Sequence, residues 1–293
     1  MYLFQLPDFP DFINQVADAT NIPAAIVEKD YWITYVLYRL KKSEFGDKFI
    51  FKGGTSLSKG WNLIERFSED IDLLFIPEEG MGSSKKRSRL EKVRDLVGSC
   101  EGLTYDGKNK DNSSGNEHRN ACFEYERKTK QAIGSLRPYL KLEMGFRGGP
   151  EPHTSRGIQS YIGKALEEAG KQNLAEDIMS FAVEVLHPKR TLVEKLFAIH
   201  SAAASGNSVG QSRHYYDLYK LLKMPEVKNF VGSAEYKALR QSVYEYSVSE
   251  FPKSPITEPD KLKESPGILL SESLEKSLQR EIEDSEMIFG DRP

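Results

Sequence analysis

The spacing of apolar residues predicts a mixed N-terminal part followed by a helical C-terminal part. Residues 11–42 are expected to be helical, because apolar side chains recur there at helix spacing and Pro23 suits a first helical turn. Short apolar runs predict strands at 49–51, 70–76, 121–125, 139–144 and 181–185. From residue 191 onward the pattern is helical again. We therefore expect an α+β fold, in which a small mixed β-sheet is flanked by helices and a helical module follows.

Two boundaries organise this pattern. Residues 78–118 are crowded with charged residues, Gly, Ser and Asn around one helical stretch, so we expect them to form an exposed excursion from the sheet. The strand-bearing part is expected to form one domain over residues 1–187, and the helical part a second domain over residues 188–293.

Composition excludes several classes of protein. Of the 293 residues, 39% are hydrophobic and 29% are charged, which is enough for a folded core. The net charge of −3 argues against a dedicated nucleic-acid binder. No apolar run is long enough to cross a membrane, and the acidic N-terminus does not resemble an export signal. Cys100 and Cys122 lack the spacing of a zinc module, and a cytoplasmic location is expected.

Two aspartates on one predicted strand are the strongest chemical signal. In the segment SEDIDLL, Asp70 and Asp72 alternate with Ile71 and Leu73, so both carboxylates point to the same face of the strand. Neighbouring carboxylates repel each other, and a divalent cation such as Mg²⁺ or Mn²⁺ relieves that repulsion. An edge strand with two solvated acids is the alternative.

A glycine turn lies 18 residues upstream of these acids. The strand ending at Lys52 leads through Gly53, Gly54 and Thr55 into a helix that is expected to run from Ser56 to about Arg66. Glycines allow the backbone to approach a ligand closely, and free N–H groups at a helix start favour phosphate oxygens. The segment is neither a Walker A loop nor a GxGxxG fingerprint, and alone it would be an ordinary turn. Beside the two aspartates, it predicts a phosphate cradle next to a metal site.

A third carboxylate belongs to the strand LKLEM. Its apolar residues face one way, whereas Lys141 and Glu143 face the other. If this strand neighbours the strand of Asp70 and Asp72, Glu143 joins the pair, and three acids could hold two Mg²⁺ ions. The alternative is a Glu on the solvent face of an amphipathic strand.

The C-terminal helices contribute further candidates. Lys195 borders an apolar helical stripe, so it either extends its amine to solvent or faces inward to meet a triphosphate. Arg213 and Asp217 are four residues apart and could form a local ion pair, although Asp217 could also orient Lys195 or contact substrate. Thr191 and Glu194 have the spacing of a capping box. If these helices pack over the sheet, the active site is a cleft between the two modules.

Five segments together resemble a known family. KGGTSLSK, RFSEDIDL, LKLEMGFRGG, VEKLFAIH and SRHYYDLYKL occur in the order seen in the AbiEii/AbiGii toxin family of nucleotidyltransferases, which have the DNA polymerase β-like fold. The resemblance runs from about residue 28 to 222. It implies a nucleotidyltransferase-type sheet. Glu143 stands where the wider superfamily often has an aspartate.

The resemblance implies a role for individual residues. Asp70 and Asp72 match the metal carboxylates, Glu143 is the third, and Lys195 and Asp217 match the family's helical lysine and aspartate. The expected nucleotide-binding residues are Lys52, Gly53, Gly54, Thr55, Lys59, Ser68 and Arg213.

The implied activity is that of a metal-dependent toxin in a toxin–antitoxin or abortive-infection system. It would transfer a nucleotide from an NTP to a tRNA 3′ end or a protein, with release of pyrophosphate, and a cognate antitoxin would be encoded nearby. A nucleotide-binding regulatory protein without turnover and a kinase-like phosphotransferase on the same fold are the alternatives.

Overall fold

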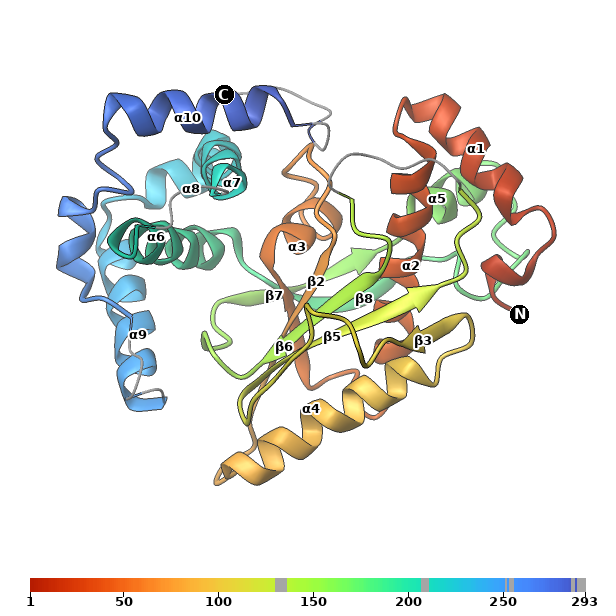
Figure 1. The fold of residues 1–293 in the computed structure, drawn as a ribbon, viewed down its shortest axis with the longest axis horizontal. Helices are drawn as coiled ribbons and strands as arrows, with labels where there is room; N and C mark the ends of the chain where they lie inside the picture. The colour runs from red at the N-terminus through yellow and green to blue at the C-terminus, as the bar shows by residue number, and fades with distance from the viewer. Residues whose placement is uncertain (130–135, 207–210, 251, 253–255, 286–287, 289–293) are drawn as a thin grey trace. The chain divides into compact units, whose positions relative to one another are not determined.

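The chain divides into two compact units in a computed structural model that describes residues 1–129, 136–206, 211–250, 252, 256–285 and 288 (Figure 1). The sheet unit comprises Met1–Trp61, Phe67–Phe146 and Ser155–Val185. The helical unit comprises Asn62–Arg66, Arg147–Thr154 and Leu186–Pro293. Two short segments therefore leave the sheet part of the sequence and join the helical unit.

An eight-stranded mixed sheet is formed by the described residues. The strands are β1 Phe49–Lys52, β2 Asp70–Phe75, β3 Leu103–Tyr105, β4 Ser113–Ser114, β5 His118–Tyr125, β6 Leu140–Gly145, β7 His153–Ile158 and β8 Phe181–Leu186. Their order is β3-β5-β6-β2-β1-β8-β7, and β4 pairs with β5. The β1–β8 and β2–β6 pairs are parallel, whereas β1–β2 and β5–β6 are antiparallel. The α+β prediction is thus confirmed.

Helices cover the sheet in the sheet unit. They are η1 Leu3–Gln5, α1 Phe9–Thr20, α2 Ala24–Lys41, α3 Gly53–Lys59, α4 Ser83–Gly98 and α5 Tyr161–Glu168. The single helical region expected over 11–42 is two helices, because Asn21 adopts a left-handed conformation and Pro23 starts α2. α3 ends at Lys59, well before Arg66, and the chain turns there through Gly60 and a left-handed Asn62.

The segment expected to leave the sheet instead extends it. Strands β3 and β4 both pair with β5, and α4 buries Leu90, Val93 and Val97. Figure 1 shows α4 lying alongside β3 and β5. Much of the charge of residues 78–118 lies on the exposed face of α4 and in turns, although Lys86 and Arg89 are buried, so the composition concealed an apolar inner stripe.

The helical unit consists of α6 Pro188–Ala204, α7 Ser212–Lys223, α8 Pro225–Phe230, α9 Ala234–Glu250, η2 Pro259–Glu264 and α10 Glu272–Glu283. The capping box expected at Thr191 and Glu194 is wrong. Pro188 occupies the first turn of α6 and the His187 side chain caps the helix, so Thr191 lies inside it, and Glu194 pairs with Arg190. No helix in the described residues is long and apolar enough to cross a membrane.

A buried aspartate fastens the N-terminus to the sheet unit. Asp177 accepts hydrogen bonds from the backbone N–H of Leu3 at 2.9 Å and from the hydroxyl of Tyr31 at 2.7 Å. Burial raises the pKa of Asp177 above its ordinary value, against the effect of these two bonds. A raised folded-state pKa means that the ionised carboxylate costs stability.

We expect Asp177→Asn to change how stability depends on pH. In the native protein, the folded state holds the Asp177 proton more tightly than the unfolded state does. The free energy of unfolding therefore decreases as the pH rises above about 3.8, the pKa of an unfolded aspartate. The amide cannot ionise, so the variant avoids this loss. The difference in unfolding free energy between the variant and the native protein should therefore shift in favour of the variant as the pH rises from 4 to 7. Urea unfolding at several pH values measures this, with Asp18→Asn on the exposed face of α1 as the control. A difference that does not depend on pH would contradict the prediction.

Candidate active site

The strand register brings three of the predicted residues into one row. Lys52 at the end of β1 pairs with Asp72 in β2, and Asp72 pairs with Glu143 in β6. β1 ends at the glycine turn, and β2 and β6 run in the opposite direction to β1. The turn, Asp72 and Glu143 therefore lie at the same end of the sheet. Directly paired residues point to the same face. The expectation that the strand of Glu143 neighbours that of Asp72 is therefore met.

Gly53 allows the turn and the Asp72 carboxylate to lie against each other. Its φ of +75° is left-handed, and a Cβ at this position would lie only 2.0 Å from Asp72 Oδ2. Thr55 Oγ1 donates to the carbonyl oxygen of Asp70 at 2.5 Å, which fastens α3 to the start of β2. Gly54 and Thr55 are both buried. The glycine is thus required by both backbone conformation and space.

Asp70 is held by an arginine that the sequence did not single out. Arg137 Nη1 lies 2.8 Å from Asp70 Oδ1, and Nη2 lies 3.4 Å from Oδ2. The preceding residue, Glu69, accepts from Arg137 Nε at 3.0 Å and from the Arg137 backbone N–H at 3.0 Å. Lys29 Nζ in turn donates to Glu69 at 2.6 Å and to the Arg137 carbonyl oxygen at 2.7 Å. A chain of alternating charges therefore runs from α2 to the first residue of β2.

The donor set fits a hard divalent cation. Asp70, Asp72 and Glu143 offer only carboxylate oxygens, the ligands that Mg²⁺ prefers. The expected grouping of three acids is not present, however: in the described part of the chain no three His, Cys, Asp or Glu side chains gather closely enough to hold a metal. Asp70 faces Arg137, and Glu143 is paired with Lys141. These carboxylates are neutralised by cationic side chains.

Lys59 has a buried partner on another helix. Its Nζ lies 2.5 Å from Asp30 Oδ1, and both side chains are almost fully buried. Asp30 Oδ2 also accepts the backbone N–H of Tyr161 at 2.9 Å, so this ion pair joins α2, α3 and the start of α5. Ser68, the other candidate in this region, is buried just before β2.

Three consecutive charges in α2 were missed by the sequence analysis. Glu28, Lys29 and Asp30 are all buried, and each binds a different segment. Glu28 accepts the backbone N–H groups of Lys128 and Thr129 at 2.6 and 2.9 Å. The signal was available, because three adjacent charges interrupt a helix whose next charged residue is Arg39, in its last turn.

A second ionic cluster lies in the helical unit. Asp217 in α7 is fully buried and accepts from Arg66 Nε and Nη2, both at 2.7 Å, while Lys195 Nζ in α6 lies 2.7 Å from Oδ2. Burial alone would raise the pKa of Asp217, but the two cations hold it well below its ordinary value. Asp217 thus orients Lys195, as one of the predicted alternatives stated.

His214 completes the surroundings of Lys195. Burial and the charge of Lys195 lower the pKa of His214 to about 3, so its ring is neutral at pH 7. Lys195 Nζ lies 3.3 Å from His214 Nδ1. Because an ammonium group can only donate, Nδ1 accepts this bond and the ring proton lies on Nε2.

The ion pair expected between Arg213 and Asp217 does not form. Arg213 is exposed on α7, and Asp217 faces Arg66 and Lys195 instead. A buried carboxylate gains more from a two-pronged guanidinium bond than from an exposed partner one helical turn away. Arg66 opens the motif RFSEDIDL, and its position before two candidate metal ligands was the available signal.

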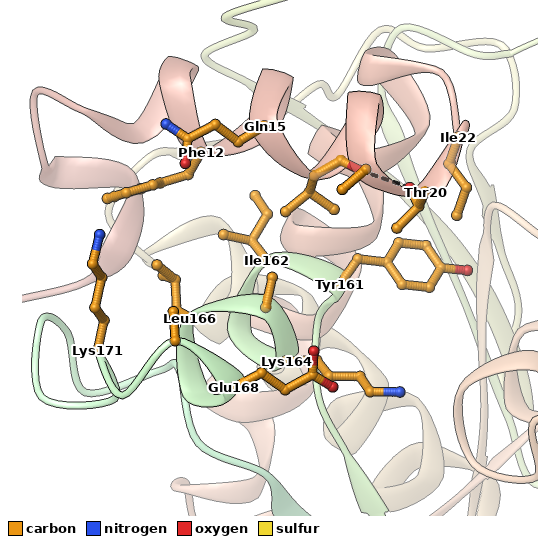
Figure 2. Close-up of a pocket in the computed structure, with 14 residues that line it drawn as sticks. Phe12, Gln15, Thr20, Ile22, Tyr161, Ile162, Lys164, Leu166, Glu168 and Lys171 are labelled. Carbon is orange, nitrogen blue, oxygen red and sulfur yellow. Dashed lines mark hydrogen bonds between the residues drawn. The ribbon is translucent and has the colours of Figure 1, made fainter.

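A separate cavity of about 600 Å³ lies between α1 and α5. Figure 2 shows apolar side chains such as Phe12, Ile162 and Leu166 along it, with polar groups of Gln15 and Glu168 at its margin. None of the residues predicted to bind metal or nucleotide lines this cavity. The candidate chemistry therefore belongs to the sheet end described above and to the Asp217 cluster.

Comparisons with known proteins agree with the fold. A family model described as "Nucleotidyl transferase AbiEii toxin, Type IV TA system" matches residues 35–285. Among solved structures, MenT4, a nucleotidyltransferase toxin from Mycobacterium tuberculosis H37Rv, is 18% identical with a TM-score of 0.58, and the match covers 90% of this chain and 78% of that one. At this identity the likeness supports the fold alone.

A second solved structure is more distant. It is an antigenic nucleotidyltransferase-like protein from Paracoccidioides brasiliensis, 13% identical with a TM-score of 0.37, and the match covers 81% of this chain and 93% of that one. The search of curated proteins found no match. Because the family model covers most of the chain, the protein belongs to the AbiEii nucleotidyltransferase toxin family of type IV toxin–antitoxin systems.

Proposed function

We propose that the protein transfers a nucleotide from an NTP to a tRNA 3′ end or a protein in a reaction that depends on Mg²⁺ or Mn²⁺. The observation that supports this most directly is the row formed by Lys52, Asp72 and Glu143 beside the turn at Gly53. This row offers cationic and backbone N–H groups to phosphates and carboxylates to a metal. A cognate antitoxin encoded nearby would restrain the activity.

Each residue of the sheet end has a role in this reaction. Asp70 and Asp72 would hold the metal, whose bound charge neutralises the triphosphate and the departing pyrophosphate. Backbone N–H groups of the turn at Gly53 and Gly54 would donate to phosphate oxygens, and Lys52 would add a positive charge in the row that it forms with Asp72. Glu143 assists the metal or accepts the proton of the attacking hydroxyl. A metal ion held by Asp70 would compete with Arg137, which contacts the Asp70 carboxylate in this structure.

The reaction balances without a further reagent. The acceptor hydroxyl oxygen forms a bond to the α-phosphorus, the bond between the α-phosphorus and the bridging oxygen breaks, and pyrophosphate leaves with that electron pair. The hydroxyl proton passes to a base. The protein contributes mainly position and electrostatic stabilisation.

Lys195 is proposed to bind the triphosphate. Two of its three N–H groups point to Asp217 and His214, so one donor is left for a phosphate oxygen. Because Asp217 also binds Arg66, the lysine is held by a carboxylate that is itself fixed. This arrangement favours a pre-oriented phosphate ligand over a flexible surface lysine.

The proposed activity is tested by supplying NTPs labelled at the α- or γ-phosphate. The purified protein is incubated with total tRNA or with a protein extract, in Mg²⁺, Mn²⁺ or EDTA. We expect α-label to join the acceptor only with metal, and Asp72→Asn to abolish transfer while Asp18→Asn does not. Transfer of γ-label would instead identify a kinase, and the absence of any transfer would support a nucleotide-binding regulator.

Gly53→Ala tests the close approach of the turn to Asp72. The new Cβ would collide with the Asp72 carboxylate, and its left-handed backbone costs a non-glycine residue about 1 kcal/mol or more. We expect a loss of transfer of at least about tenfold together with a small decrease in melting temperature, because the collision displaces a metal ligand. Gly80→Ala is the control, since Gly80 is also left-handed but has open space around it. Equal effects of the two changes would show that Gly53 matters for backbone conformation alone.

Lys195 and Asp217 should respond differently to substitution. In Lys195→Met, Asp217 keeps both bonds to Arg66, so we expect a folded protein with transfer reduced by about ten- to a hundredfold. In Asp217→Asn, two buried cations lose their counter-ion, which is expected to cost about 3–5 kcal/mol of stability.

Urea unfolding and labelled transfer separate the two effects. Lys189→Met is the matched control, because Lys189 lies on the same helix and pairs with Glu235 at 3.0 Å. If Lys195→Met were as active as Lys189→Met, the proposed role of Lys195 in phosphate binding would have to be abandoned.

A further inference from the structure

Arg137, beside the proposed metal ligands, is anchored through both its backbone and its side chain. Its backbone N–H and Nε both bind Glu69, and its carbonyl oxygen accepts from Lys29. Glu69 and Lys29 are almost completely buried. Three bonds to buried groups therefore fix where this residue lies, while its side chain remains 20% exposed.

Only the outer end of the guanidinium faces the proposed site. Nη1 and Nη2 contact the two carboxylate oxygens of Asp70, and Nη1 lies 4.0 Å from Asp111. A residue with a merely structural role would need only the bonds to Glu69 and Lys29. The additional two-pronged contact neutralises the carboxylate that opens β2.

A metal ion that binds Asp70 competes with this guanidinium, whose Nη1 and Nη2 contact both carboxylate oxygens. Both are positive, and within a few ångströms in a partly buried site their repulsion is strong. We therefore expect metal binding to displace Nη1 and Nη2 from Asp70, while the bonds to Glu69 and Lys29 keep the residue in place. A guanidinium with free outer donors next to a metal suits the oxygens of a phosphate.

We infer that Arg137 is the internal counter-ion of Asp70, which the metal displaces and which then binds a phosphate oxygen of the NTP. This inference rests on the proposed function. It makes metal and nucleotide binding mutually dependent, because metal alone must break the Arg137–Asp70 pair without compensation, whereas metal with NTP gives the guanidinium a new partner. Such coupling is reciprocal.

The test measures Mn²⁺ binding and NTP binding to the full-length protein separately. Free Mn²⁺ is followed by electron paramagnetic resonance without nucleotide, and NTP binding is followed by calorimetry in saturating Mn²⁺, where Arg137 is released from Asp70. For Arg137→Gln we expect Mn²⁺ to bind about ten- to a hundredfold more tightly and NTP to bind more weakly by a similar factor, the range of one charge-assisted bond. Arg94→Gln is the matched control, because Arg94 also pairs with an aspartate, Asp95, but lies on α4.

Further variants separate the possible failures. Arg137→Lys keeps the charge without the planar fork, so Mn²⁺ affinity should stay near the native value while NTP affinity decreases, and this holds even if Arg137→Gln does not fold. Unchanged or weaker Mn²⁺ binding in Arg137→Gln, with Mn²⁺ binding lost in Asp70→Asn, would overturn the inference and leave the proposed function standing. Equal Mn²⁺ binding by the native protein and Asp70→Asn would overturn the proposed function itself.

Discussion

The geometry of the sheet end depends on the buried ion pair between Lys29 and Glu69. The Lys29 side chain has no exposed surface, and burial lowers its pKa against the attraction of Glu69. Removing either partner would leave a charge buried without its counter-ion, which costs about 3–5 kcal/mol in proteins. Because Glu69 also fixes Arg137 and immediately precedes Asp70, this pair sets the position of the proposed metal ligand and of its counter-ion together.

Three consecutive residues of α2 are buried charges that each bind a distant segment of the chain. Glu28, Lys29 and Asp30 bind, respectively, the segment after β5, the segments before β2 and β6, and the junction of α3 with α5. None of these segments is near α2 in the sequence. Adjacent helical positions point about 100° apart, so one helical turn can reach three directions. These three charged side chains therefore bind backbone groups of the converging segments, which apolar side chains could not satisfy.

The sequence predicted features that depend on neighbouring residues, and it missed features that depend on partners distant along the chain. Strand alternation placed Asp70 and Asp72 on one face, and the glycine turn stood out because backbone conformation is a property of a few residues. Arg137 and Arg66 were missed because their importance lies in partners far away along the chain. Of the alternatives left open for Asp217, the local pair with Arg213 does not form for the same reason, since distant buried partners outcompete a close exposed one.

Glu69 and Asp70 show how position separates a structural acid from a candidate metal ligand. They are neighbours in sequence and contact the same arginine, yet Glu69 is 5% exposed and Asp70 is 22% exposed in their side chains. Glu69 binds both Arg137 and Lys29, so two cations already balance its buried charge. Among the described residues, the Asp70 carboxylate forms hydrogen bonds only with the outer end of Arg137, at a face that it shares with Asp72. A carboxylate with one exchangeable cation can accept a metal in its place, whereas one bound by two anchored cations cannot.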